Sequence, residues 1–329
     1  MSSPPTGKDS ANAEAATLAQ KRLKRAARKL RLHRQLRDRT LRQFQRRLSV
    51  TWRPAFNLYD DLLSASLLAA SNHSEQGWQR AEAETDFTFE ALRRLHARGF
   101  IVASEIRPLL AAGFASGALA RWRTLHEVTV VASFLSGQTA NVSEAYMLHH
   151  QARAWFETEV YERHQPVIAP ASPLDAHLIK DHRAMRDALR ERYGATFTEE
   201  YGWANNVLGR TRLKLVDLEQ AVGMDHWRPW VHLAHQSIHA TYKAMRFDIG
   251  WTSTTPDEII PVGPSNAGLA DPFGCASLSL ALLTRCFVCH PRARADDAGF
   301  LTLIDALQVR LGEVALAVHF SLAAADSQE

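Results

Sequence analysis

The sequence predicts an all-α protein, a multi-helix bundle with a protruding basic helix at its N-terminus. Apolar residues recur at steps of three and four along most of the chain, as in Leu58, Leu62, Ala65 and Ala69. The one run that favours β-structure, 128–131, lies inside such a helical pattern. With 46% apolar and 22% charged residues, the 329-residue chain has the composition of a globular protein.

The N-terminal segment differs in composition from the rest of the chain. Residues 1–53 hold 15 Lys or Arg and three acids, a net charge of +12, which leaves −8 for the remainder of a chain whose total is +4. The Ser-, Pro- and Ala-rich start, 1–17, predicts disorder. Residues 18–53 are strong helix formers and predict a basic helical arm that ends near Pro54. We expect an all-helical body over 54–329.

A basic arm beside an acidic body indicates a polyanionic partner. We expect nucleic acid, RNA rather than DNA, and a homo-oligomer; a membrane surface, a partner protein or another subunit's acidic body are the alternatives. The arm residues that we expect to bind nucleic acid are Lys21, Arg22, Arg25, Arg28, Arg31, Arg34, Arg42 and Arg46.

The body is expected to contain helices over 75–98, 143–164, 174–193, 204–222, 226–247, 271–290 and 297–323. Residues 100–136 are expected to form one long helix or two, bent near Pro108. Gly113 and Gly117, among alanines, offer a small-residue surface that another helix could approach closely. The stretch 250–272 is long enough to be a lid or an ordered site loop.

Three features of the sequence predict where in the cell the protein is located. Charged residues break the apolar stretch 100–135, so we expect no membrane span. The start has no apolar core for a signal peptide, and three cysteines suit a reducing compartment. These observations predict a cytoplasmic protein.

Polar residues inside the most apolar helix are the first candidates for a site. Arg123 and Glu127 lie one turn apart among apolar neighbours, which predicts a buried pair, either an intrahelical ion pair or part of a site. An Arg followed after four to six residues by His is the signature of the HEPN ribonucleases. Four such pairs occur, about as many as chance gives, and only Arg121/His126 lies in this helix.

Two further clusters carry weaker signals. His232, His235 and His239 share a helical spacing that suits a metal, but no carboxylate accompanies them, so a satisfied polar face is expected. The segment 286–290, Cys-Phe-Val-Cys-His, has the spacing of covalent haem attachment. Its cysteines end an apolar run and are expected to act as small hydrophobes. We expect no cofactor and no metal.

Arg123-Thr-Leu-His-Glu127, followed by an apolar helix, resembles the "Arg-x-Leu-x-Glu" helix of bacterial proteins grouped as domain of unknown function 5677. The segment 237–241 looks like that family's "Val-His-Ala-Ser", with Thr241 where the family often has Ser, and 263–272 looks like its closing loop. The resemblance covers about residues 55–290. It implies an all-helical bacterial protein found near stress and phage-defence genes, with Arg123, Glu127 and His239 as its notable polar residues.

These residues support one enzymatic hypothesis, a metal-independent ribonuclease. His239 or His126 would act as general base or acid. Arg123 or Arg121 would stabilise charge on the phosphate, and Glu127 would orient the Arg or His. We expect Arg123, Glu127 and His239 to converge on one polar pocket.

The rival hypothesis is a non-enzymatic regulatory or scaffold module whose arm binds nucleic acid or a partner protein. A third is small-ligand sensing under the 250–272 loop. Convergence of the polar residues in a cleft that solvent reaches would favour the enzyme, and burial in a dry core would favour the module.

Overall fold

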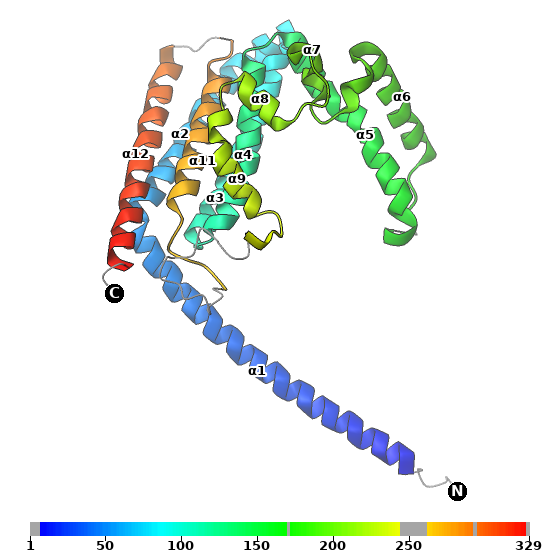
Figure 1. The fold of residues 1–329 in the computed structure, drawn as a ribbon, viewed down its shortest axis with the longest axis vertical. Coiled ribbons are helices and arrows are strands. Elements are labelled where there is room, and N and C mark those ends of the chain that lie inside the picture. The colour runs from blue at the N-terminus through cyan, green and yellow to red at the C-terminus, as the bar shows by residue number, and fades with distance from the viewer. Residues whose placement is uncertain (1–6, 170–171, 244–261, 292–294, 327–329) are drawn as a thin grey trace. The chain divides into compact units, whose positions relative to one another are not determined.

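The computed structural model describes residues 7–169, 172–243, 262–291 and 295–326, and every regular element within these ranges is a helix, which confirms the all-α class (Figure 1). The α-helices are α1 Gly7–Thr51, α2 Arg53–Glu84, α3 Phe87–Ala111, α4 Ala115–Ser136, α5 Ala140–Ile168, α6 Ala176–Tyr193, α7 Asn205–Leu208, α8 Leu215–Ala221, α9 Arg228–Gln236, α11 Ala270–Val288 and α12 Ala295–Asp326. None of the described helices is long and apolar enough to cross a membrane.

The chain divides into two compact units, Met1–Thr51 and Trp52–Glu329. The first consists of α1, which begins at Gly7 although we expected disorder up to residue 17. Alanines recur between residues 11 and 19 and favour helix strongly enough to extend it toward the N-terminus. Pro54 lies in the first turn of α2, where its missing N–H costs nothing.

The second unit is built around α11, which packs against α2, α3, α4 and α12. Most of the side chains of α11 are buried, since its sequence is apolar on every side. Its Phe273 ring lies 5.4–5.8 Å, centroid to centroid, from the rings of Trp52, Phe56 and Tyr59. This aromatic group fixes the N-terminal half of α2 against α11.

Polar atoms in this core are paired with one another. Ser66 Oγ of α2 lies 2.7 Å from Thr284 Oγ1 of α11 and 3.2 Å from His96 Nε2 of α3. Burial lowers the pKa of His96 to about 4, so its imidazole is neutral at physiological pH. Three helices are thus joined by hydrogen bonds among uncharged groups.

Helices α3 and α11 approach closely at a glycine that we did not single out. A Cβ on Gly99 of α3 would lie 2.1 Å from Leu283 Cδ2 of α11 and 3.2 Å from Leu125 Cδ1 of α4. A Cβ on Gly117 would meet only ordinary contacts at 3.7 Å. Gly113 has φ +82° and turns the chain between α3 and α4. The expected close approach therefore depends on Gly99.

Short elements cover α4 where longer helices were expected. The predicted helix 204–222 is two helices, because Gly209 takes a left-handed conformation (φ +62°) and ends α7. Within the predicted 226–247, α9 ends at Gln236, and 244–247 lie outside the described residues. Both α8 and α9 pack on α4.

The expected loop 250–272 is described from residue 262 onward. Ser265 N–H donates to the carbonyl of Gly113 (2.9 Å), and the Trp52 indole donates to Asn266 Oδ1 (2.7 Å). These bonds hold 265–266 against the start of α2 and the α3–α4 turn. The rest of the proposed lid, 250–261, lies outside the described residues.

Candidate functional site

A group of polar side chains joins α4 to α9. Arg123 Nε–H of α4 donates to His235 Nε2 of α9 (2.6 Å), and Arg123 Nη1 lies 3.6 Å from Glu127 Oε2. Tyr201 donates its hydroxyl to Glu127 Oε1 (3.0 Å). We call these four residues the α4–α9 cluster.

Local packing explains how three separate segments meet there. Arg123 and Glu127 are four residues apart and therefore share one side of α4. Tyr201 precedes a 3₁₀ turn, Gly202–Ala204, whose Trp203 ring packs edge-on against Phe134 of α4. On α9, the buried Val231 and Ala234 hold the helix to the body and place His235 beside the α4 surface.

The expectation that Arg123 and Glu127 are buried is wrong. Their side chains are 30% and 37% exposed. Their neighbours in sequence, Trp122 and Leu125, are buried because they lie on a different side of the helix. The cluster therefore lies at the edge of the core, within reach of solvent.

The hydrogen bond from Arg123 determines the protonation of His235. Arginine has only donors, so His235 Nε2 must accept with its lone pair, and a neutral ring carries its proton on Nδ1. Burial and the positive charge of Arg123 both lower the pKa of His235. At the other end of the cluster, burial and Glu127 raise the pKa of Tyr201, which stays a phenol and donates.

His239 lies beyond the end of α9 and is exposed. Its ring centroid lies 5.9 Å from that of His235, and the exposed His232 ring lies 6.1 Å from His235 on the preceding turn. The histidine that binds Arg123 is thus His235, although sequence reasoning singled out His239. His235 could have been identified in the sequence because it lies beside Val231 and Ala234, the apolar residues that hold α9 to the body.

Arg121 and His126 do not act as a pair, since each has its own partner. Arg121 forms an ion pair with Glu105 of α3. His126 is buried and donates from Nε2 to Glu219 Oε1 of α8 (2.9 Å), and Glu219 Oε2 accepts from Arg228 Nη1 of α9 (3.1 Å). His126 therefore belongs to a buried network that joins α4, α8 and α9.

Glu219 is the centre of this second network and is fully buried. Burial by itself raises the pKa of a carboxyl group, but the hydrogen bond from His126 and the charge of Arg228 outweigh it and lower the pKa of Glu219. The carboxylate is therefore ionised, and both of its oxygens are paired.

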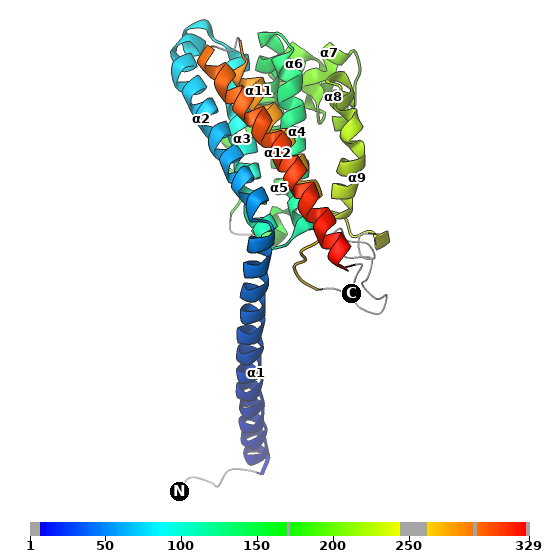
Figure 2. The ribbon, with the colours of Figure 1, turned by 90° about the vertical axis from the view of Figure 1, so that its left-hand side faces the viewer.

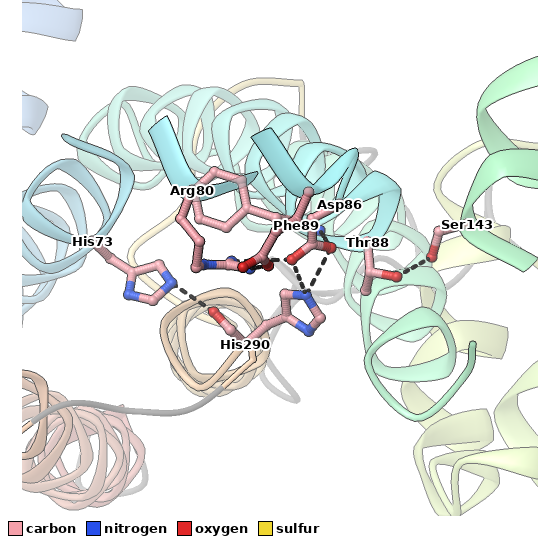
Figure 3. A network of polar contacts seen from close by, with 8 residues as sticks. His73, Arg80, Asp86, Thr88, Phe89, Ser143 and His290 are labelled. Carbon is pink, nitrogen blue, oxygen red and sulfur yellow. Dashed lines mark hydrogen bonds and ion pairs between the residues drawn. The ribbon is translucent and has the colours of Figure 1, made fainter. Parts of the chain in front are cut away.

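The Cys-Phe-Val-Cys-His segment serves a structural role (Figure 3). His290 Nε2 lies 3.1 and 3.2 Å from the two oxygens of Asp86, which also accepts from Arg80 (3.0 Å) and caps α3. His73 Nε2 lies 2.8 Å from the carbonyl oxygen of His290. The ring nitrogen that a haem iron would need is thus bonded to Asp86.

The cysteines of this segment fit the same interpretation. Burial raises the pKa of both the Cys286 and the Cys289 thiols, so neither is an activated thiolate. Within the described ranges, no group of three or more His, Cys, Asp or Glu side chains is placed to hold a metal ion.

Two hollows on the surface lie away from the α4–α9 cluster. One, of ≈ 760 Å³, is lined by residues of α3 and α5, including Phe87, Arg94 and Tyr146. The other, of ≈ 220 Å³, is lined by residues around the α2–α3 turn, including Trp78. No residue of the cluster lines either one.

Residues 89–257 match the model of a family of unknown function, DUF5677. The chain belongs to this family. The DUF5677 match covers just over half of the 329 residues and includes Arg123, Glu127, Tyr201 and His235, whereas α1, α11 and α12 lie outside it. It is narrower than the 55–290 that the sequence resemblance suggested. No curated protein and no solved structure matches the chain.

We predict that Glu219 stabilises the fold and that Glu127 does so only weakly. Glu219→Ala should lower the free energy of unfolding by about 3 kcal/mol, because it leaves His126 and Arg228 without their buried partner. Glu127→Ala, the half-exposed control, should cost less than about 1 kcal/mol. Urea unfolding at pH 7 measures both, and equal losses would contradict the assignment.

The same network gives stability a pH dependence. Folding lowers the pKa of Glu219, so its stabilisation is complete above the unfolded value, about 4.3, and is lost as the pH falls below it. Between pH 5 and 3, Glu219→Gln should lose less stability than the wild type. If the free energy of unfolding of the variant falls with pH as steeply as that of the wild type, the carboxylate of Glu219 does not cause the pH dependence.

Proposed function

We propose that this protein binds nucleic acid, RNA in preference to DNA, through α1. The observation that carries the proposal is the exposure of the helix's cations. Between residues 18 and 51 the only acid is Asp38. Against it stand thirteen exposed basic residues: Lys21, Arg22, Lys24, Arg25, Arg28, Lys29, Arg31, Arg34, Arg37, Arg39, Arg42, Arg46 and Arg47.

Eleven of these cations lie on one side of the helix, because at about 100° per residue all of them except Arg34 and Arg37 fall within one half of the circumference of α1. Arg34, which we expected to bind nucleic acid, lies on the other side. The opposite half carries Leu23, Leu30 and Leu41. From Lys21 to Arg47 the face is about 40 Å long at ~1.5 Å per residue, which is enough to follow a row of phosphates.

The chemistry of the face suits phosphates rather than bases. Guanidinium groups bind phosphate oxygens with paired N–H donors, and each neutralised phosphate releases condensed counterions. Contacts of this kind carry affinity but little sequence information. We therefore expect strong salt dependence and weak sequence preference.

A membrane surface is less suited to this helix. A helix that lies in a membrane interface needs a broad apolar face. Arg34 and Arg37 interrupt the leucine side of α1 near its middle, and Leu30 there is flanked by charge. The family resemblance to proteins encoded near stress and phage-defence genes fits a role that acts on nucleic acid.

The test compares two pairs of substitutions that remove the same charge. Arg28→Gln with Arg42→Gln removes two cations from the basic face, and Arg34→Gln with Arg37→Gln removes two from the leucine side. The first pair should weaken single-stranded RNA binding at least about tenfold and reduce the slope of log K against log [salt] by about 1.4, at ~0.7 per phosphate contact. The second pair should change both much less.

Fluorescence anisotropy with labelled RNA and DNA of equal length, over a range of salt, measures these effects. An equal loss of RNA affinity for the two pairs of substitutions would contradict a single binding face. Failure of the wild type to bind any nucleic acid, with binding to anionic vesicles instead, would overturn the proposal.

A second candidate function is metal-independent RNA cleavage at the α4–α9 cluster. The observation that favours it is that Arg123 is within reach of solvent and uses only one of its five N–H groups to bind His235. The exposed His239 ring lies beside the ring of His235. His239 would take the proton of a ribose 2′-hydroxyl, whose oxygen attacks the phosphorus as the bond to the 5′-oxygen breaks. Arg123, held by Glu127, would stabilise the phosphate charge, and water would protonate the leaving oxygen.

His232 supplies the matched control for this candidate, since it is exposed and flanks His235 from the other side. In chelator, His239→Ala should reduce cleavage of labelled RNA by at least ~100-fold, and His232→Ala should leave it nearly unchanged. Both variants should keep the wild-type thermal midpoint. Wild-type protein that binds RNA but leaves it intact would instead identify a non-enzymatic module.

A further inference from the structure

Helix α12 is apolar on two opposite sides. Its core side is buried through Leu301, Ile304 and Leu311. On the outer side Val309 and Phe320 are 55% and 65% exposed. Figure 2 shows α12 in front of α11 and α2. A helix with apolar residues on two opposite sides is normally covered on both, so the outer side indicates a protein partner.

The outer residues follow the spacing of a coiled-coil seam. They recur at alternating steps of four and three, which is the a/d pattern of a heptad. We call the following set the outer seam: Thr302, Ala306, Val309, Glu313, Leu316, Phe320 and Ala323. Leu316 is 49% exposed, and Leu303, which lies off the seam, is exposed to nearly the same extent, 48%. Leu303 therefore serves as a control that matches Leu316 in residue type and exposure but lies off the seam.

The seam is complementary to itself in size when a copy runs antiparallel. With the axis at Glu313, Ala306 and Phe320 are each seven residues from it and lie opposite one another, and Val309 and Leu316, four and three residues from it, share a layer. Each layer then pairs a small residue with a large one, or two of middle size, which fills space evenly. A parallel arrangement would place Phe320 against Phe320 and Ala306 against Ala306, with crowding at one layer and a void at the other.

The charges at the centre are also self-complementary. Arg310 Nη1 donates to Glu313 Oε2 of the same helix (2.9 Å), and both side chains are well exposed. Across a two-fold axis at Glu313, each Arg310 comes beside the Glu313 of the other copy. The two Glu313 carboxylates then meet at the axis with an Arg310 guanidinium on either side of them, whereas the parallel arrangement would place each Arg310 beside the other Arg310.

We propose that the protein dimerises through α12, whose outer seam packs antiparallel on the same seam of a second copy. The interface is isologous, with its axis at Glu313. The inference is independent of the proposed nucleic-acid binding, since it rests on a helix of the second unit. A dimer would carry two basic arms, so the arms could bind one polyanion with enhanced avidity.

The first test is the mass of the full-length protein by light scattering and sedimentation equilibrium at micromolar concentration. The wild type should be a dimer. Leu316→Glu should raise the dimer Kd by at least about 100-fold, because it places unpaired charges in the interface. Leu303→Glu, the off-seam control, should remain dimeric, and circular dichroism should be unchanged for both.

Two outcomes of this measurement would overturn the proposal. One is a wild type that is monomeric at tens of micromolar. The other is a dimer that survives Leu316→Glu but dissociates when Leu23→Glu and Leu30→Glu are placed on the leucine side of α1, which would assign the interface to the arm.

The second test uses disulfide capture to determine the direction of the helices. Oxidised with diamide, Glu313→Cys should form a covalent dimer by itself, because the axis brings the two thiols together. Val309→Cys should not, but a mixture of Val309→Cys and Leu316→Cys chains should. Wild-type protein treated in the same way controls for its three native cysteines. Capture of Val309→Cys by itself, as efficient as that of Glu313→Cys, would contradict the antiparallel arrangement.

Discussion

The enclosure of α11 is the constraint on which the body of this protein depends. Because its sequence is apolar on every side, other helices must surround it, and α2, α3, α4 and α12 do so. Three of the polar side chains inside the enclosure, Ser66, His96 and Thr284, are uncharged and hydrogen-bonded to one another. Arg123 and Glu127 lie at the outer edge of α4, where they meet α9.

The cost of burying charge also explains why α1 differs from the body. Cations as dense as those of α1 cannot share a core without anions, and α1 supplies almost none. The helix therefore exposes its charge, which is why we propose a polyanionic ligand for it, whereas charged side chains of the body form ion pairs such as Arg228 with Glu219. The two proposals, binding by the arm and chemistry at the α4–α9 cluster, are therefore independent, and either can hold without the other.

Sequence periodicity was sufficient for the helical class and for the contact of Arg123 with Glu127, since both depend on spacing along one helix. It failed where neighbours in space decide the outcome. The apolar residues next to Arg123 in sequence lie about 100° away around the helix, so they do not predict its burial. The choice of His235 over His239 depends on where α9 ends, and the close approach at Gly99 depends on Leu283, far along the chain. Neither is encoded locally.

The central claim is that the ligand of this protein is nucleic acid and that α1 holds it. Hydrogen–deuterium exchange of the full chain, with and without a saturating single-stranded RNA, tests this most directly. A helix whose side chains are exposed as those of α1 are exchanges quickly, so binding should slow exchange across residues 21–47 and leave α11 unchanged. Protection confined to α4 and α9, or no protection anywhere at saturation, would contradict the claim.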